Sequence, residues 1–190
     1  MLKKLFISKV RIRILEQYMS DLSNTFHVRG LVRILDEEIN AVRREVLNLE
    51  AAGILKSQKD GNKLVYRINK KCPILWELRS MFFKESTVGA RILEVVNSIE
   101  GIMLVVLTES FLKKKYSNPT DVDFLFIGEM KVRDLSIAMT EAEKELGREI
   151  RFSAIRKEDF DFARKKKDPF LMNILENDKI IMFGQISDLL

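Results

Sequence analysis

The sequence has almost none of the residues that stabilise secreted domains and structural metal sites. It contains one cysteine, Cys72, and one histidine, His27, in 190 residues. A single cysteine excludes an internal disulfide, and one histidine with one cysteine cannot form a structural zinc site. No second metal-binding side chain lies near His27 in the sequence, so we interpret it as a packed or capping residue. This composition suits a reducing compartment, and we expect a cytoplasmic protein.

Long hydrophobic runs are also absent. The longest, Ile102 to Leu107, is far shorter than a bilayer requires, while 46% hydrophobic residues are ample for folded cores. The segment 1–19 is basic and amphipathic, but Glu16 and the lack of a small-residue cleavage site favour a domain helix over a targeting peptide. We therefore expect a folded, soluble protein with one large domain or two small ones.

Acidic charge is scarce in the N-terminal half. Residues 1–86 carry 17 Lys and Arg against 10 Asp and Glu, whereas residues 87–190 carry 16 against 18. The net charge of +5 therefore hides a strongly basic half. Such a half favours a polyanionic partner, although ordinary solvated lysines would produce the same balance.

Three helices followed by a hairpin are predicted in this basic half. Apolar residues recur there at helical spacing, and Gly53 is expected to cap the third helix. Asp60-Gly61 lies between two β-prone runs and predicts a tight hairpin turn. Asn24-Thr25 is expected to form a turn after the first helix. The predicted helices are Ser8–Ser20, Val28–Leu35 and the segment 36–53.

The order of these elements resembles the winged helix-turn-helix fold of the arsenic-repressor-like regulators. The segments FHVRGLVRIL, AVRREVLNLEAAGIL and GNKLVYRINKKCPIL carry the resemblance, which covers about residues 8–84. In that family the third helix enters the major groove of DNA, and the hairpin, called the wing, lies along the backbone. By position, the resemblance implies DNA-binding roles for Asn40, Arg43, Arg44, Lys59, Asn62 and Lys63.

These residue types suit duplex DNA. The guanidinium of arginine pairs with guanine edges or phosphates, and wing lysines neutralise phosphate. The alternative is that Arg43 and Arg44 belong to an ordinary solvated helix face. Asp36, Glu37 and Glu38 crowd the start of the presumed recognition helix, where carboxylates favour the helix dipole but repel phosphate. Weak base recognition, or a wing domain that binds protein as a scaffold, is therefore an alternative.

The segment after Pro73, ILWELRSMFF, predicts a helix rich in large apolar residues, including Trp76. We expect this helix to be too apolar for a lone wing domain to bury and to pack against a second domain or subunit. In the resembled family such a flanking helix often forms the dimer, and two wing domains suit a two-fold DNA site. We therefore expect a homodimer, with packing inside one chain as the alternative.

Helices and strands alternate after a polar joint at residues 84–87. Strands are predicted at 102–107, 122–128, 149–155 and 179–184, with helices between them. The fold class is therefore a two-domain chain of α+β and α/β type. We place a winged helix-turn-helix DNA-binding domain at 1–86 and a nucleotidyltransferase-like domain with a mixed sheet at 87–190.

The second half resembles the minimal nucleotidyltransferases of the polymerase-beta superfamily. Ser110 stands eleven residues before Asp121, and Asp121-Val122-Asp123 matches the metal pair of that family. There, a Gly-Ser at a helix N-terminus holds the triphosphate, and the pair with a third carboxylate binds two magnesium ions. The resemblance implies these roles for Ser110, Asp121 and Asp123. An Asp-x-Asp can also be a strand-edge pair hydrogen-bonded to a neighbouring loop.

Three departures from the family pattern argue against catalysis. Glu109 occupies the glycine position, Lys114 replaces a second small residue, and Arg151 stands near the expected third carboxylate. We therefore predict a pseudoenzyme domain used for sensing or assembly, in which Ser110, Asp121 and Asp123 are vestigial. Any metal binding by the two aspartates should be weak, and the pair should be nearly dispensable for folding.

The overall prediction is a DNA-binding transcriptional regulator with no cofactor. The enzyme alternative is an active nucleotidyltransferase that uses Mg²⁺ and a nucleoside triphosphate and is targeted by its winged helix. The lysines at 113–115 are a candidate anion-binding cluster, or simply a solvated face.

Overall fold

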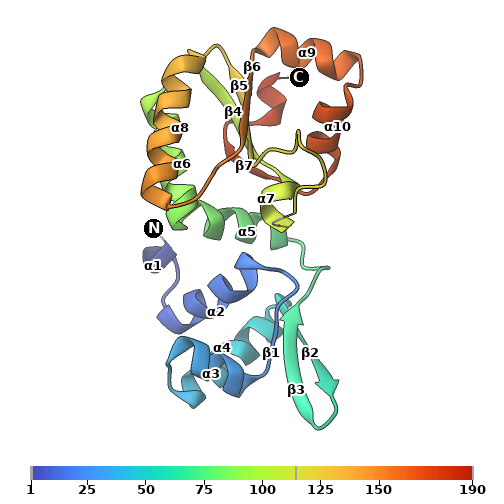
Figure 1. Cartoon of the computed structure of the whole chain (residues 1–190). Coiled ribbons are helices and arrows are strands. Elements are labelled where there is room, and N and C mark those ends of the chain that lie inside the picture. Colours follow the sequence, from blue (N-terminus) through green and yellow to red (C-terminus); the bar gives the residue numbers. More distant parts are fainter. Residues whose placement is uncertain (1, 114, 190) are drawn as a thin grey trace. The chain divides into compact units, whose positions relative to one another are not determined.

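Contacts divide the chain into an N-terminal unit, Met1–Glu85, and a C-terminal unit, Ser86–Leu190 (Figure 1). The computed structural model describes residues 2–113 and 115–189. Each unit has its own sheet, so the prediction of a mixed α and β chain is confirmed. None of the helices in the described part of the chain is long and apolar enough to cross a membrane.

The N-terminal unit packs its helices against a small antiparallel sheet of strand order β1-β3-β2. The expected turn at Asn24-Thr25 lies two residues earlier, at Leu22-Ser23, because the Asn24 amide donates to the Asp21 carbonyl and Thr25 pairs with Arg67 in this sheet. The helices are α1 (Leu2–Leu5), α2 (Lys9–Ser20), α3 (Val28–Leu35), α4 (Ile39–Ala51) and α5 (Leu75–Lys84). The strands are β1 (Thr25–Phe26), β2 (Leu55–Asp60) and β3 (Lys63–Ile68).

Capping residues define where the first helices begin and end. The Ser8 hydroxyl accepts a hydrogen bond from the Arg11 amide at 3.2 Å and starts α2. After α4, Gly53 adopts a left-handed conformation with φ of +74°, and the amide of Ile54 donates to the carbonyl of Leu49. This is the hydrogen-bonded ending for which glycine is best suited. Gly53 therefore has the role that the sequence predicted.

The hairpin turn lies one residue later than expected. Asp60 pairs with Lys63 as the last strand pair, so that the two-residue loop is Gly61-Asn62. Gly61 supplies the positive φ, +56°, that a tight hairpin loop requires. Asp60 remains a strand residue.

The core of the N-terminal unit gathers residues from α2, α4 and α5 around Tyr18. The Tyr18 hydroxyl is buried and donates to the Tyr66 carbonyl at 3.0 Å, and burial raises the pKa of this phenol. Leu75, Leu78 and Phe82 of α5 belong to the same cluster. The expectation that α5 needs a partner outside its own unit is therefore wrong for these three side chains.

The C-terminal unit contains a four-stranded mixed sheet of order β6-β5-β4-β7. β4 runs antiparallel to β5 and β7, whereas β5 and β6 are parallel. The strands are β4 (Ile102–Leu107), β5 (Phe124–Gly128), β6 (Phe152–Ile155) and β7 (Ile180–Phe183). The helical segments are α6 (Thr87–Ser98), α7 (Glu109–Lys113), α8 (Val132–Leu146), α9 (Lys157–Lys165), α10 (Pro169–Glu176) and a final 3₁₀ turn, Ile186–Leu189.

Helices cover both faces of this sheet. In Figure 1, α6 and α8 lie on one side and α9 and α10 on the other. Phe160, Leu171 and Ile174 of α9 and α10 pack on apolar residues of β4 and β5. All residues of β5 are buried, as expected for a central strand with both faces covered. The segments 108–113, 115–123 and 147–151 lie at the ends of the strands of this packed sheet.

Candidate functional site

One face of α4 carries the three residues predicted to enter the major groove. Asn40, Arg43 and Arg44 are all exposed. The opposite face packs in the core through Val42, Val46 and Leu49. Because the two sets alternate at helical spacing, burial of one set orients the other towards solvent.

The three predicted wing residues are at the tip of the hairpin. Leu55 is buried at the base of β2, and residues 56–64 are exposed without interruption. Asn62 lies in the two-residue loop, Lys63 pairs with Asp60, and Lys59 pairs with Leu64. The hairpin extends away from the helices of its unit (Figure 1). Both sides of its tip are therefore free to contact another molecule.

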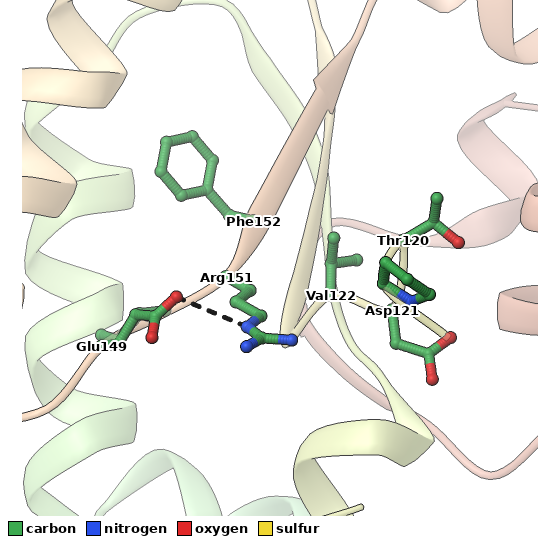
Figure 2. Close-up of a pocket in the computed structure, with 8 residues that line it drawn as sticks. Thr120, Asp121, Val122, Glu149, Arg151 and Phe152 are labelled. Atoms are coloured by element: carbon green, nitrogen blue, oxygen red, sulfur yellow. Dashed lines mark ion pairs between the residues drawn. The ribbon is translucent and has the colours of Figure 1, made fainter. Parts of the chain in front are cut away.

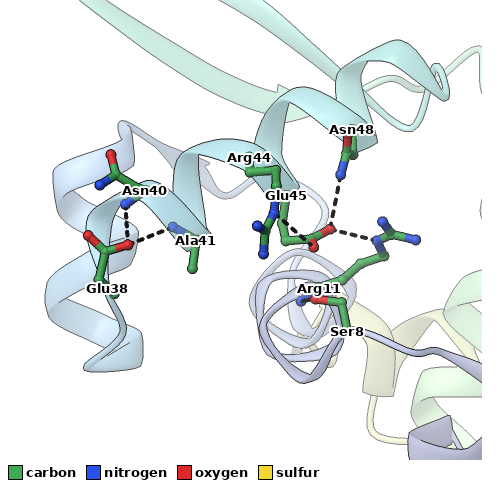
Figure 3. Close-up of polar contacts among 8 residues, drawn as sticks. All are labelled: Ser8, Arg11, Glu38, Asn40, Ala41, Arg44, Glu45 and Asn48. Atoms are coloured by element: carbon green, nitrogen blue, oxygen red, sulfur yellow. Dashed lines mark hydrogen bonds and ion pairs between the residues drawn. The ribbon is translucent and has the colours of Figure 1, made fainter.

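The acidic residues before α4 have structural roles that sequence reasoning missed. The Glu38 carboxylate accepts hydrogen bonds from the amides of Asn40 and Ala41, at 2.7 and 2.9 Å, and caps the helix (Figure 3). Glu37 forms an ion pair of 2.6 Å with Arg13 of α2. Asp36 ends α3 in a left-handed conformation. The backbone of Asp36 and the carboxylates of Glu37 and Glu38 thus shape the turn between α3 and α4, and the Glu38 carboxylate occupies donors that a phosphate would otherwise use.

A buried carboxylate, Glu45, fixes α4 against α2. Only 4% of Glu45 is exposed, and its carboxylate accepts hydrogen bonds from Arg11 Nε at 2.9 Å and Asn48 Nδ2 at 3.5 Å. Figure 3 shows Ser8 and Arg11 approaching from α2. Burial alone would raise the pKa of Glu45, but hydrogen bonds from Ser8 and these two side chains outweigh it and lower that pKa. In the sequence, Glu45 lies between Val42 and Leu49 on the apolar side of the helix. This position could have indicated a buried carboxylate with a partner.

The two aspartates of the Asp-x-Asp motif precede β5 and accept hydrogen bonds from neighbouring groups of their own unit. Asp121 Oδ2 accepts hydrogen bonds from the amides of Ser117 and Asn118, at 2.6 and 2.9 Å. Asp123 is completely buried. Both therefore correspond to the alternative considered from the sequence, a pair hydrogen-bonded to a neighbouring loop.

Three groups surround the Asp123 carboxylate. The Tyr116 hydroxyl donates to Oδ1 at 2.5 Å, the Arg151 amide donates to Oδ2 at 3.0 Å, and the Arg148 guanidinium lies 3.7 Å from Oδ2. Burial raises the pKa of Tyr116 to about 12, and the hydrogen bond and charge of Asp123 contribute to the same shift. Tyr116 is therefore a protonated donor at neutral pH. Nothing in its sequence context indicated this role.

Two residues of the expected phosphate loop, Glu109 and Ser110, lie on the short α7. Glu109 begins this helix and forms an ion pair of 2.5 Å with Lys113. Ser110 follows on the same helix and is partly buried. Lys114 lies outside the described residues. The Lys113 ammonium therefore balances the charge of the Glu109 carboxylate.

An open hollow of about 660 Å³ lies beside the aspartates. It is bounded by residues 119–122 on one side and 149–152 on the other (Figure 2). Arg151 extends into it, forms an ion pair of 3.4 Å with Glu149 and stacks on the Tyr116 ring at 4.5 Å. Within the described residues, no cluster of three or more His, Cys, Asp or Glu side chains could hold a metal ion. The Arg151 guanidinium thus lies in a hollow that Asp121 also lines.

Comparisons with known proteins add little to this description. No protein-family model matches the chain, and no curated protein matches it. Among solved structures, the chain is similar to reduced HlyU from Vibrio cholerae N16961, with 21% identity and a TM-score of 0.33. The similarity covers 43% of this chain and 77% of that one. A likeness this distant defines neither the fold nor the activity of this chain.

We expect the contribution of Glu45 to stability to depend on pH. Because its folded-state pKa is lowered, the stabilisation is present above the ordinary glutamate pKa of about 4.3 and is lost as the pH falls through the folded-state value. Glu45→Gln should lower the free energy of unfolding by about 1 to 2 kcal/mol at pH 7, and by less at pH 3. Urea titrations at both pH values measure the difference. Glu16→Gln, at an exposed position of α2, is the control, and a pH-independent loss in Glu45→Gln would contradict the assignment.

We expect Asp123 to be essential for the stability of the C-terminal unit. Asp123→Asn replaces the carboxylate by a neutral carboxamide next to the Arg151 backbone N–H and the Arg148 guanidinium. The substitution should lower the free energy of unfolding by about 2 to 4 kcal/mol. Asp121→Asn is the matched control. It lies at the edge of the hollow and should cost no more than about 1 kcal/mol. Denaturation followed by circular dichroism tests both variants, and wild-type stability in Asp123→Asn would show that the buried contacts are unimportant.

Proposed function

We propose that the N-terminal unit binds duplex DNA and that the protein is a transcriptional regulator. The observation that carries the proposal is the division of α4 into a packed face and an exposed face with Asn40, Arg43 and Arg44. Arginine and asparagine are the side chains that hydrogen-bond the edges of guanine and adenine in the major groove. The excess of positive charge in this half of the sequence supplies attraction to phosphate.

The hairpin supports the same proposal. Lys59, Asn62 and Lys63 lie on an exposed antiparallel ribbon that ends in a two-residue loop. Ammonium groups at such a tip neutralise phosphates without selecting a sequence. The proposed division of roles is therefore base recognition by α4 and sequence-independent attraction by the wing.

For the C-terminal unit we propose a nucleotidyltransferase-like domain that does not catalyse transfer and serves sensing or assembly. Its Asp123 carboxylate already accepts hydrogen bonds from Tyr116 and Arg151. A magnesium ion would have to displace these donors, and the Arg151 guanidinium would repel it. An active enzyme would therefore require a rearrangement of the loop residues 115–120.

A homodimer in the cytoplasm is part of the same proposal, because two wing domains suit a two-fold DNA site. Trp76 and Ile74, on and just before α5, are 43% and 50% exposed. They are the candidate contacts on this helix, since its other large apolar residues are mostly buried in their own unit.

We expect the α4 and wing residues to affect DNA binding in different ways. Arg43→Ala with Arg44→Ala should weaken binding to the preferred sequence by about 1 to 3 kcal/mol per good contact. Lys59→Ala and Lys63→Ala should weaken all duplexes alike, and each should lower the slope of log K against log salt by about one. Fluorescence anisotropy over a range of salt concentrations measures both effects. Arg133→Ala, an exposed charge on α8, is the control. Unchanged binding in every variant would rule out this surface.

We expect no nucleotidyl transfer by the wild-type protein. Each of the four ribonucleoside triphosphates, radiolabelled and supplied with Mg²⁺ or Mn²⁺, should fail to label the protein, DNA or RNA. Labelling that disappears in the Asp121→Asn variant, which we expect to fold, would replace the pseudoenzyme proposal with the enzyme alternative. A protein that neither binds DNA nor transfers nucleotides, but captures a protein partner independently of salt, would favour the scaffold alternative.

A further inference from the structure

The exposed face of α4 contains one residue that DNA attraction does not explain. Within Ile39–Ala51, all of which the structure describes, Leu47 is the large apolar side chain left 48% exposed. The apolar residues that pack α4 into the core, Val42, Val46 and Leu49, are on the opposite side. Leu47 therefore exposes apolar surface to water on the face of α4 that is proposed to meet DNA.

The position of Leu47 places it among the arginines. It follows Arg43 by four residues and Arg44 by three, spacings that bring side chains together on one side of a helix. Side chains on a helix lean towards its N-terminus, so Leu47 covers the turn that holds both arginines. An α4 placed with its arginines against base edges brings the Leu47 side chain to the floor of the same groove.

The major groove offers one apolar group to such a side chain. The other groups on its base edges are hydrogen-bond donors and acceptors, whereas thymine presents its C5 methyl group. We propose that Leu47 contacts the C5 methyl of a thymine adjacent to the guanines contacted by Arg43 or Arg44. The inference rests on the proposed DNA binding and adds the base that the apolar residue selects.

The contact has a defined size. Removing one methyl group from water on binding should strengthen the affinity about fourfold. Replacement of thymine by deoxyuridine deletes this methyl and leaves every hydrogen-bonding group of the base in place. Leu47→Ala removes the protein side of the same contact. The variant should fold normally, because Leu47 is half-exposed and alanine is the strongest helix former.

The experiment begins with selection of duplexes from a random pool by the full-length protein. Each thymine of the best duplex is then replaced singly by deoxyuridine, and affinity is measured by anisotropy. For the wild type we expect about a fourfold loss at one thymine, or at its symmetry-related pair, next to a guanine. The Leu47→Ala variant should bind the thymine duplex more weakly and should show no further loss at that position.

Ile34→Ala is the matched control, because Ile34 is 49% exposed on the neighbouring α3 and is not on the α4 face. This variant should keep the full sensitivity to deoxyuridine. Selected duplexes without a recurrent thymine, a wild type indifferent to deoxyuridine, or a Leu47→Ala variant that stays sensitive would each overturn the inference while DNA binding stands. A protein that binds no duplex at all would overturn the proposed function and the inference with it.

Discussion

The C-terminal unit depends on one negative charge that has been removed from water. A buried carboxylate is tolerated only where donors and positive charge replace its hydration, and Asp123 obtains these from Tyr116, Arg148 and Arg151. The donors come from the loop before β5 and from the segment before β6. The carboxylate therefore holds two segments together at one edge of the sheet. Its lone pairs are directed at the protein, which leaves little coordinating capacity for a metal ion.

The N-terminal unit uses acidic side chains for the same purpose. Glu45 joins α4 to α2 through Arg11, Glu37 joins the turn to α2 through Arg13, and Glu38 caps α4. Each of these carboxylates has a partner inside the unit. The local negative charge near α4 is thus largely compensated, while Arg43 and the wing lysines extend into solvent. Glu37, Glu38 and Glu45 thus help to fix the position of α4, and with it the direction in which its arginines point.

Local patterns were enough to predict much of the fold. The helix Val28–Leu35 and the strand Ile102–Leu107 were predicted with their observed limits, because apolar residues at helical spacing mark the helix and a continuous apolar run marks the strand. The hairpin turn was misplaced by one residue, since Asp-Gly and Gly-Asn both suit a two-residue loop and only strand register distinguishes them.

The partners of buried charges could not be predicted in this way. Asp123 meets the Arg151 amide 28 residues later in the sequence, and Glu45 meets Arg11 34 residues earlier. Neither pairing leaves a trace in local spacing. The expectation that the two aspartates are nearly dispensable considered them only as metal ligands, and it stays a prediction that the Asp121→Asn and Asp123→Asn variants test. The positions proposed for DNA contact came from the family resemblance, and the exposure of those on α4 agrees with the periodicity that buries the other face of this helix.

The position of β2 at an edge of its sheet has a consequence for self-association. One side of an edge strand presents unpaired backbone donors and acceptors, which can extend a sheet into a neighbouring molecule. Lys56 and Lys59 are exposed along β2, and their charge repels an identical strand approaching the same edge. Lys59, which is proposed to attract phosphate, therefore also disfavours edge-to-edge pairing of two wings. Substitution of Lys56 and Lys59 would remove this repulsion from the edge strand.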